Sequence, residues 1–261
     1  MSGLKDFMGI PMLPLNAAAN GDTIDRMNEY IHWFMLALFV FWSAFFIYTL
    51  VRFRASRQPR ASYEGLKASF PKYLEAGVVI VEIILLVGFS IPLWAQWTED
   101  FPAEKDAVVV RVVAEQFAWN FHYAGPDGKF GKGNPKLIDV QTNPLGLDRK
   151  GDADAADDVV VKQLHLPVDK PAIAHVSSKD VIHAFGIPAL RVKQDATPGM
   201  SIPVAFTPIR EGKYLIACSQ LCGVGHSTMR GFVEIHSKAS FEQWMSREVE
   251  QAKSAGSEES W

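Results

Sequence analysis

Two long apolar segments near the N-terminus constrain this chain more than any other feature. Residues 31–51, IHWFMLALFVFWSAFFIYTLV, contain no Asp, Glu, Lys or Arg. A helix of about 21 residues reaches roughly 31 Å, which matches the hydrocarbon core of a bilayer. Residues 76–97, AGVVIVEIILLVGFSIPLWAQW, contain one acid, Glu82. We therefore predict two membrane-spanning helices, over about residues 29–52 and 74–97.

The loop between these segments is basic. Residues 52–72 carry Lys and Arg at six positions and one acid, Glu64. Because basic loops stay on the cytoplasmic side of a membrane, we expect both chain ends on the outer side. The short apolar run over residues 7–15 contains two prolines and has few positive residues beside it. We therefore expect that it is not cleaved as a signal peptide.

After about residue 99 the pattern changes to short runs rich in β-branched and aromatic residues. Turn sequences such as GPDG at 125–128 and PG at 198–199 separate these runs. Several short strands without helices between them are typical of a β-sandwich or barrel. The expected strands cover residues 108–113, 116–123, 159–164, 172–176, 202–206, 214–217 and 232–235.

The predicted fold is two N-terminal transmembrane helices followed by an all-β sandwich. Residues 1–98 form the N-terminal segment and helix hairpin, and residues 99–237 form the outer β domain. Residues 125–158 are poor in apolar side chains and end in GDADAADD, which indicates a surface insertion. Residues 238–261 are expected to form a helical or flexible tail.

Composition excludes several classes of protein. The 26 Lys and Arg residues against 29 Asp and Glu give a net charge of -3, which argues against a nucleic-acid partner. Only 2 Cys are present, so a scaffold of several disulfides is excluded.

The chemistry-bearing segment is residues 218–229, CSQLCGVGHSTM. It brings Cys218, Cys222, His226 and Met229 within twelve residues, directly after an expected strand. Cys and Met favour soft metals such as copper, and imidazole also suits copper. A further imidazole, His183, is expected on another loop.

Three other interpretations compete with a copper cluster. A disulfide between Cys218 and Cys222 suits an oxidising compartment but leaves His226 and Met229 unexplained. A structural zinc site normally uses Cys and His without Met. A mononuclear blue-copper site needs one Cys, and the second Cys suggests two metals that share bridging sulfurs.

These motifs resemble subunit II of haem-copper cytochrome c oxidases. The resemblance lies in the spacing Cys218-x3-Cys222-x3-His226-x2-Met229, in DVIHAFGIP at 180–188 and in KQDATPG at 193–199. It extends over nearly the whole chain and implies that the outer domain is a cupredoxin.

By that resemblance, Cys218 and Cys222 bridge a binuclear copper centre, CuA. His183 and His226 would be terminal ligands, Met229 a weak ligand, and the backbone carbonyl of Gln220 another. The family usually has Glu at the position of Gln220, where the carboxylate also helps to hold magnesium. A neutral amide is a weaker magnesium ligand, so the resemblance leaves open whether this chain also helps to bind magnesium.

The resemblance also implies a function and partners. The chain would be the subunit at which electrons enter a terminal oxidase, taking them from a c-type cytochrome at CuA. It would pass them to haem in subunit I, where oxygen is reduced to water and protons are pumped. Subunit III and membrane lipid are further expected partners, and haem is expected only in the partner subunit. The expected location is a bacterial cytoplasmic (inner) membrane, with the C-terminal domain on the periplasmic side.

The strand through which electrons enter reads Gln-Trp-x-Trp in the family and Gln116-Phe117-Ala118-Trp119 here. We interpret Phe117 and Trp119 as residues near that surface. Simple core packing is the alternative, because alternate residues of a strand share one face.

Two acids of the second predicted helix, residues 74–97, suggest a proton path. Glu75 stands where the family has an acid at the mouth of a proton channel, and Glu82 follows two helical turns later on the same face. A charge in the membrane is costly unless it is paired or neutralised, which makes such an acid a functional candidate. A protonated Glu82 that hydrogen-bonds the neighbouring subunit is the alternative.

Other functions stay open beside the oxidase. A CuA subunit of a nitric oxide reductase would differ mainly in its partner subunit. A membrane-anchored copper-delivery protein could carry Cys-x3-Cys, but would typically have one membrane helix and a thioredoxin-like βαβ pattern. A copper-free quinol oxidase subunit shares the architecture and lacks the metal ligands.

Overall fold

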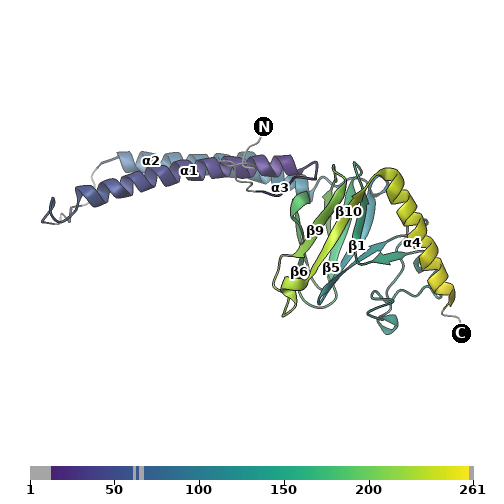
Figure 1. Cartoon of the computed structure of the whole chain (residues 1–261). Coiled ribbons are helices and arrows are strands. Elements are labelled where there is room, and N and C mark those ends of the chain that lie inside the picture. The colour runs from purple at the N-terminus through teal and green to yellow at the C-terminus, as the bar shows by residue number, and fades with distance from the viewer. Residues whose placement is uncertain (1–12, 61–62, 65–67, 259–261) are drawn as a thin grey trace. The chain divides into compact units, whose positions relative to one another are not determined.

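A computed structural model describes residues 13–60, 63–64 and 68–258 of the chain (Figure 1). The chain divides into two compact units. One contains residues 23–96 with the apolar helices, and the other contains residues 14–22 and the chain from residue 97 onward.

The first unit is built from two long apolar helical runs. Helix α1 covers Gly21–Arg52. The second run consists of α2 (Phe70–Leu85), a π-helical turn (Leu86–Ser90) and α3 (Ile91–Thr98). Both runs are long and apolar enough to cross a membrane, at 32 and 29 residues.

Both helices begin earlier than predicted. Helix α1 starts at Gly21 rather than about residue 29, with Asp22 in its first turn. Helix α2 starts at Phe70 rather than about residue 74, with a proline in its first turn. An acid and a proline both suit a helix N-terminus, so each helix extends beyond its apolar core.

The second unit contains two five-stranded sheets, which confirms the prediction of a β-sandwich after two apolar helices. The sheet orders are β3-β2-β1-β5-β8 and β4-β10-β9-β6-β7. The pairs β1–β5 and β4–β10 are parallel, and the other pairs are antiparallel. The strands are β1 (Val108–Glu115), β2 (Ala118–Tyr123), β3 (Val159–Val161), β4 (Leu164–Pro167), β5 (Ala172–Ser178), β6 (His183–Ile187), β7 (Val192–Ala196), β8 (Ile202–Phe206), β9 (Gly212–Cys218) and β10 (Arg230–His236).

Strands β6 and β7 were not among the strands predicted from the sequence. His183, which was expected on a loop, is the first residue of β6. Strand β6 is short, contains Gly186 and is followed directly by Pro188. Its propensity is therefore weak, and its burial between neighbouring strands stabilises it instead.

An aromatic cluster fills the space between the sheets. The ring of Phe185 on β6 lies 5.6 Å from that of Trp119 and 6.3 Å from that of Phe121, both on β2. All three side chains are buried. This cluster fixes the position of β6 and therefore of His183.

The insertion over residues 125–158 covers the outer face of β2. Its last residue, Asp158, is 0% exposed, although the sequence analysis placed the whole insertion on the surface. The Asp158 carboxylate lies 2.6 Å from His122 Nε2 and accepts the Gly131 amide at 2.8 Å. A buried carboxylate is stable only when such partners satisfy it. Strand β2 is thus buried on both faces.

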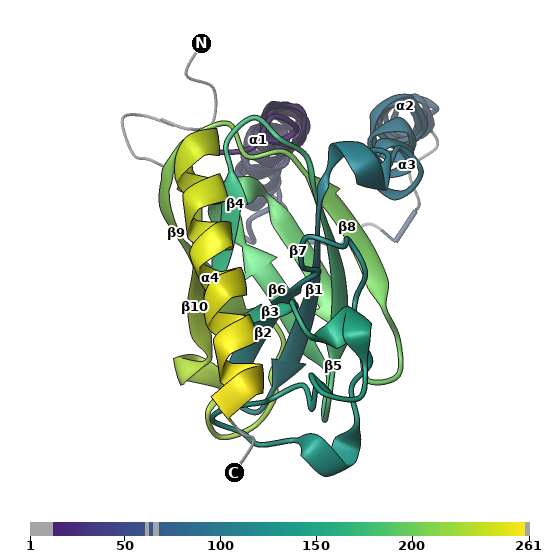
Figure 2. The ribbon, with the colours of Figure 1, turned by 90° about the vertical axis from the view of Figure 1, so that its right-hand side faces the viewer.

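The second unit also includes segments from both ends of the chain. Ala17 donates its amide to Ala189 O at 2.8 Å and accepts the Ile209 amide at 2.9 Å. Helix α4 (Lys238–Glu258) runs along the side of the sandwich and packs on β4 and β10 (Figure 2). The unit therefore extends beyond the predicted boundaries of 99 and 237.

Candidate metal centre

One loop between adjacent strands carries most of the sulfur and nitrogen ligands. Cys218 is the last residue of β9, and Met229 directly precedes β10. The Cys218 amide donates to Met229 O at 3.2 Å and closes the base of this loop. The intervening chain contains Cys222 and a short 3-10 turn that begins at His226. The antiparallel pairing of β9 and β10 thus brings both ends of the motif together.

The side chains of this loop converge on Cys222. Its Sγ lies 3.8 Å from Cys218 Sγ, 3.7 Å from His226 Nδ1 and 3.8 Å from Met229 Sδ. Both cysteines are free thiols in this structure. The loop therefore presents two sulfurs side by side instead of the disulfide considered above.

Strand β6 supplies the second imidazole. Phe185 lies opposite Cys218 in the β6–β9 register, which places His183 just beyond the end of β9. His183 Nδ1 is 3.9 Å from Cys218 Sγ, and the carbonyl oxygen of Gln220 is 3.0 Å from the same sulfur. The ligand atoms of His183, Cys218 and Cys222 all lie within 4.8 Å of one another.

The cluster is shielded from water. His183, Cys218, Cys222 and Met229 are buried, and His226 is half-buried. Burial raises the pKa of the Cys222 thiol to about 11, and the adjacent Cys218 adds to this rise. Without metal the thiol is therefore protonated at neutral pH. Because a metal binds the thiolate, metal loading must release a proton here.

Asp180 orients the imidazole of His183. Its Oδ1 lies 2.9 Å from His183 Nε2, and its Oδ2 accepts the backbone amide of Gln116 at 2.7 Å. With Nε2–H donating to the carboxylate, Nδ1 keeps its lone pair directed at Cys218. Metal-binding histidines commonly donate their other N–H to a carboxylate in this way.

Hydrogen bonds also set the charge of Asp180. Burial alone would raise the pKa of this carboxyl, but hydrogen bonds from His183, Gln116 and Val181 outweigh burial and lower the pKa. Asp180 is therefore ionised at neutral pH. This role was not predicted from the sequence, although the Asp-x-x-His spacing contained the signal.

The turn before β2 packs directly on the cysteine loop. Gln116 Nε2 donates to Cys222 O at 2.6 Å. The Phe117 ring lies against Gly225, where a Cβ would come within 2.4 Å of the ring. Gly223 has φ of +132°, a conformation that side chains disfavour. These two glycines allow the loop to approach Phe117.

Phe117 and Trp119 occupy different environments. Phe117 is 36% exposed at the rim of the cluster, whereas Trp119 is only 2% exposed. The Trp119 ring lies beneath the imidazole of His183, with 6.3 Å between ring centroids. Trp119 thus belongs to the core that supports the site and not to its surface.

The other predicted residues lie apart from this cluster. Glu75 and Glu82 are on α2, in the unit that contains the apolar helices, and both are exposed on this chain. Their spacing of seven residues places them on one helix face.

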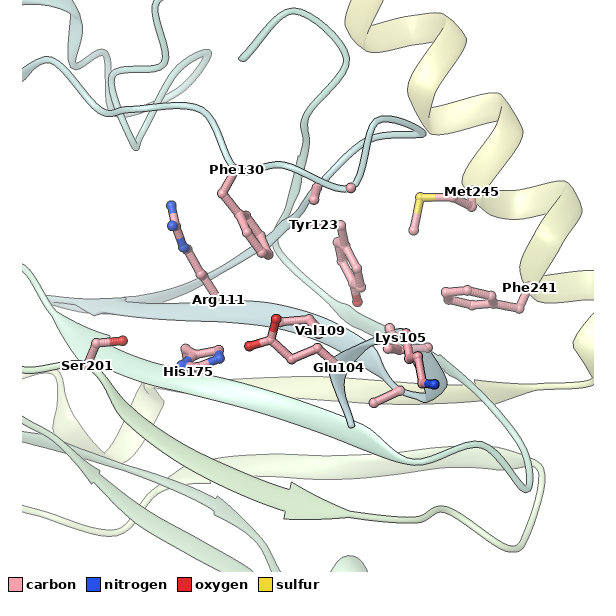
Figure 3. A pocket seen from close by; sticks show the side chains of 14 residues that line it. Glu104, Lys105, Val109, Arg111, Tyr123, Phe130, His175, Ser201, Phe241 and Met245 are labelled. Atoms are coloured by element: carbon pink, nitrogen blue, oxygen red, sulfur yellow. The ribbon is translucent and has the colours of Figure 1, made fainter. Parts of the chain in front are cut away.

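A separate cavity of about 640 Å³ lies beside α4 (Figure 3). Figure 3 shows Tyr123, Phe241 and Met245 at one end, and Arg111 and His175 toward the other. None of the predicted site residues lines this cavity. Its charged residues have both signs, so its chemistry does not favour one class of ligand.

The donor set of the cluster fits copper. Two thiols, two imidazoles and a thioether are soft or intermediate donors, which copper prefers and which structural zinc sites do not combine. A mononuclear blue-copper site would use one Cys. Two adjacent sulfurs suit a centre in which thiolates are shared between two metals.

Comparison with known proteins identifies relatives of this chain. The family model described as cytochrome c oxidase subunit II, periplasmic domain, matches residues 108–236. The alternative cytochrome c oxidase subunit 2 of Bradyrhizobium diazoefficiens is 30% identical over 234 residues, covering 88% of this chain and 82% of that protein. Cytochrome c oxidase subunit 2 of Synechocystis is 26% identical over 248 residues, covering 90% of this chain and 75% of that protein.

Among solved structures, the periplasmic domain of subunit II of cytochrome oxidase (CoxB) of Bradyrhizobium japonicum is similar, with a TM-score of 0.40 and 23% identity. The match covers 55% of this chain and 94% of that chain. The family assignment rests on the sequence relatives and agrees with the resemblance in the ligand motifs. The chain belongs to the cytochrome c oxidase subunit II family.

Proposed function

We propose that this chain is the subunit at which electrons enter a haem-copper terminal oxidase. The observation that carries the proposal is the convergence of two cysteines, two histidines and a methionine in a shielded cluster. When bound there, two copper ions would supply a one-electron site whose charge is shared between the metals. Cys218, Cys222, His183, His226, Met229 and the Gln220 carbonyl are the proposed ligands.

The arrangement favours electron transfer over substrate binding. Asp180 and the β6–β9 pairing hold His183, and the closed β9–β10 loop holds both sulfurs. The protein supplies all the proposed ligands. A catalytic metal site keeps an open position for substrate, whereas a relay needs rigid, filled coordination.

The proposed partners follow from this role. A c-type cytochrome would supply electrons on the periplasmic side, and haem in subunit I would receive them for oxygen reduction coupled to proton pumping. Subunit III and membrane lipid would contact the helices in a bacterial cytoplasmic membrane. Gln220 is exposed and neutral, so we propose copper as the bound metal and do not propose a magnesium site.

A copper-delivery protein fits the structure less well. Such a protein would typically carry one membrane helix and a thioredoxin-like βαβ domain. This chain has two long apolar helical runs and a two-sheet sandwich. The nitric oxide reductase alternative differs in its partner subunit and is tested by the oxygen consumption of the assembled complex.

Replacing one sulfur tests the metal centre. We expect the purified full chain to bind two copper ions, and Cys222→Ser to bind no more than one, because a bridging thiolate is lost. Copper per chain is measured by elemental analysis after dialysis. Ser227→Ala, on the same loop, is the control and should keep both ions. A wild-type chain that binds one copper ion, or a Cys222→Ser chain that binds two, contradicts the proposal.

Loss of the Asp180 charge should weaken copper binding. Asp180→Asn keeps the side-chain shape but removes the carboxylate that orients His183. Changes in such supporting residues typically cost about 10–100-fold in metal affinity, and we expect a loss of that size. Competition with a copper chelator measures it. Asp195→Asn on β7 is the control, and equal affinity in the two variants would show that Asp180 has no such role.

Phe117 is the proposed surface for electron transfer from the donor. It packs on the cysteine loop and is partly exposed, whereas Trp119 is buried against His183. We expect Phe117→Leu to lower the rate of electron transfer from reduced c-type cytochrome several-fold at unchanged copper content, measured by stopped flow in the assembled oxidase. Val140→Ala, on the insertion, should leave the rate unchanged. An unaltered rate in Phe117→Leu argues against this surface.

Glu75 and Glu82 are the proposed proton-path residues of this chain. Glu82→Gln removes the titrating proton but keeps the size of the side chain, so we expect slower proton-coupled turnover in reconstituted vesicles. Glu99→Gln, beyond the end of α3, is the control. Unchanged turnover and proton uptake in Glu82→Gln would contradict a role in proton transfer and would leave a structural hydrogen bond as the only role of Glu82.

A further inference from the structure

A second group of ligating side chains lies on the outer face of β4 and β10. The two strands are parallel, and His165 on β4 pairs in register with Glu234 on β10. Since alternate residues of a strand share a face, His236 projects on the same side as Glu234. Three potential metal ligands from two strands therefore meet at one point of the sheet.

The ligand atoms are close enough to share one ion. His165 Nδ1 is 2.8 Å from His236 Nε2 and 3.9 Å from Glu234 Oε2. All three ligand atoms lie within 4.8 Å of one another. Around a tetrahedral zinc ion, Zn–N distances of about 2.0–2.1 Å place neighbouring ligands about 3.3 Å apart. The His165–His236 pair is about 0.5 Å closer than this and the His165–Glu234 pair about 0.6 Å farther apart, so side-chain adjustments of about half an ångström would fit these two pairs to an ion.

The surroundings hold His165 in place. The Tyr123 hydroxyl donates to His165 O and accepts the His165 amide, both at 2.8 Å. Trp244 of α4 stacks on the imidazole with 4.1 Å between ring centroids, and the ring of His236 stacks at 5.1 Å. A ligand fixed by packing and hydrogen bonds loses little freedom when it binds metal.

The charges around the cluster leave ligand positions open. Lys213 Nζ bonds Glu234 Oε1 at 2.7 Å, which leaves Oε2 directed toward His165. Burial lowers the pKa of His165 to about 4, and His236 adds to this effect.

We propose that His165, Glu234 and His236 form a binding site for a divalent transition-metal ion, with Zn²⁺ as the representative ion. Two imidazoles and one carboxylate are a donor set that suits zinc, and water would complete the coordination. The site is distinct from the sulfur cluster. Met229 precedes β10 and His236 ends it, and seven residues of strand span about 23 Å.

The ion would join β4 to β10 directly under Trp244. It would replace the His165–His236 hydrogen bond with bonds from both imidazoles to one metal. Because the ion binds only the folded arrangement, it would stabilise the sheet edge on which α4 packs.

Zinc binding to the copper-loaded full chain in detergent tests the proposal. Copper is loaded first to occupy Cys218 and Cys222, and copper held only by imidazole ligands is removed by dialysis before zinc is added, because such ligands also bind copper. We expect one zinc ion per chain in equilibrium dialysis, and a loss of at least tenfold in affinity in both His165→Gln and Glu234→Gln. His175→Gln, a strand histidine of the other sheet, is the control and should bind zinc as the wild type does.

A second measurement keeps the test independent of folding defects. Zinc should raise the Tm of the wild type and of His175→Gln, and should leave that of Glu234→Gln unchanged. Circular dichroism identifies any variant that fails to fold.

Equal zinc binding in wild type, His165→Gln and Glu234→Gln overturns the site, as does a wild type that binds no zinc. Zinc binding that disappears only in Cys222→Ser would place the ion at the sulfur cluster. Loss of the zinc site with an intact copper content also separates this proposal from the proposed function.

Discussion

The hydrogen bonds to the Asp180 carboxylate hold three separate parts of the chain in one arrangement. Two of them come from its own segment, from the imidazole of His183 and the amide of Val181, and one comes from the backbone of Gln116 before β2; the third part of the chain, the cysteine loop, is reached through Gln116. Gln116 in turn bonds the backbone of Cys222. The ionised carboxylate of Asp180 therefore adds to the β6–β9 pairing in setting the relative position of imidazole and thiols. Below it, the rings of Trp119 and Phe185 supply a rigid floor, so the ligands are placed before any metal binds.

Strand β10 links two regions with different metal chemistry. Its first residues follow Met229 and the sulfur cluster, whereas Glu234 and His236 lie near its other end under α4. Soft donors gather at one end and nitrogen and oxygen donors at the other. Thiolates and a thioether select soft metals such as copper, whereas imidazole with carboxylate also suits zinc, so the two ends of one strand can hold different metals.

Much of this arrangement could be predicted from the sequence, because its signals are local. The two apolar runs predict the helices, and the spacing of Cys218, Cys222, His226 and Met229 predicts a compact cluster once a strand pair closes the loop.

Other features depend on contacts between distant segments. Strand β6 has weak propensity and is stabilised by its neighbours, so His183 was expected on a loop. Asp158 lies in an acidic surface sequence, and only its contact with His122 shows why it is buried. The His165–His236 pair joins residues 71 positions apart, and no local spacing indicates it.

The most direct test of the copper centre is the electron paramagnetic resonance spectrum of the copper-loaded full chain. If Cys218 and Cys222 share their sulfurs between two metals, the unpaired electron should be spread over both. We therefore expect hyperfine splitting from two equivalent copper nuclei. Splitting from a single copper nucleus in a fully loaded chain would contradict a shared pair of thiolates.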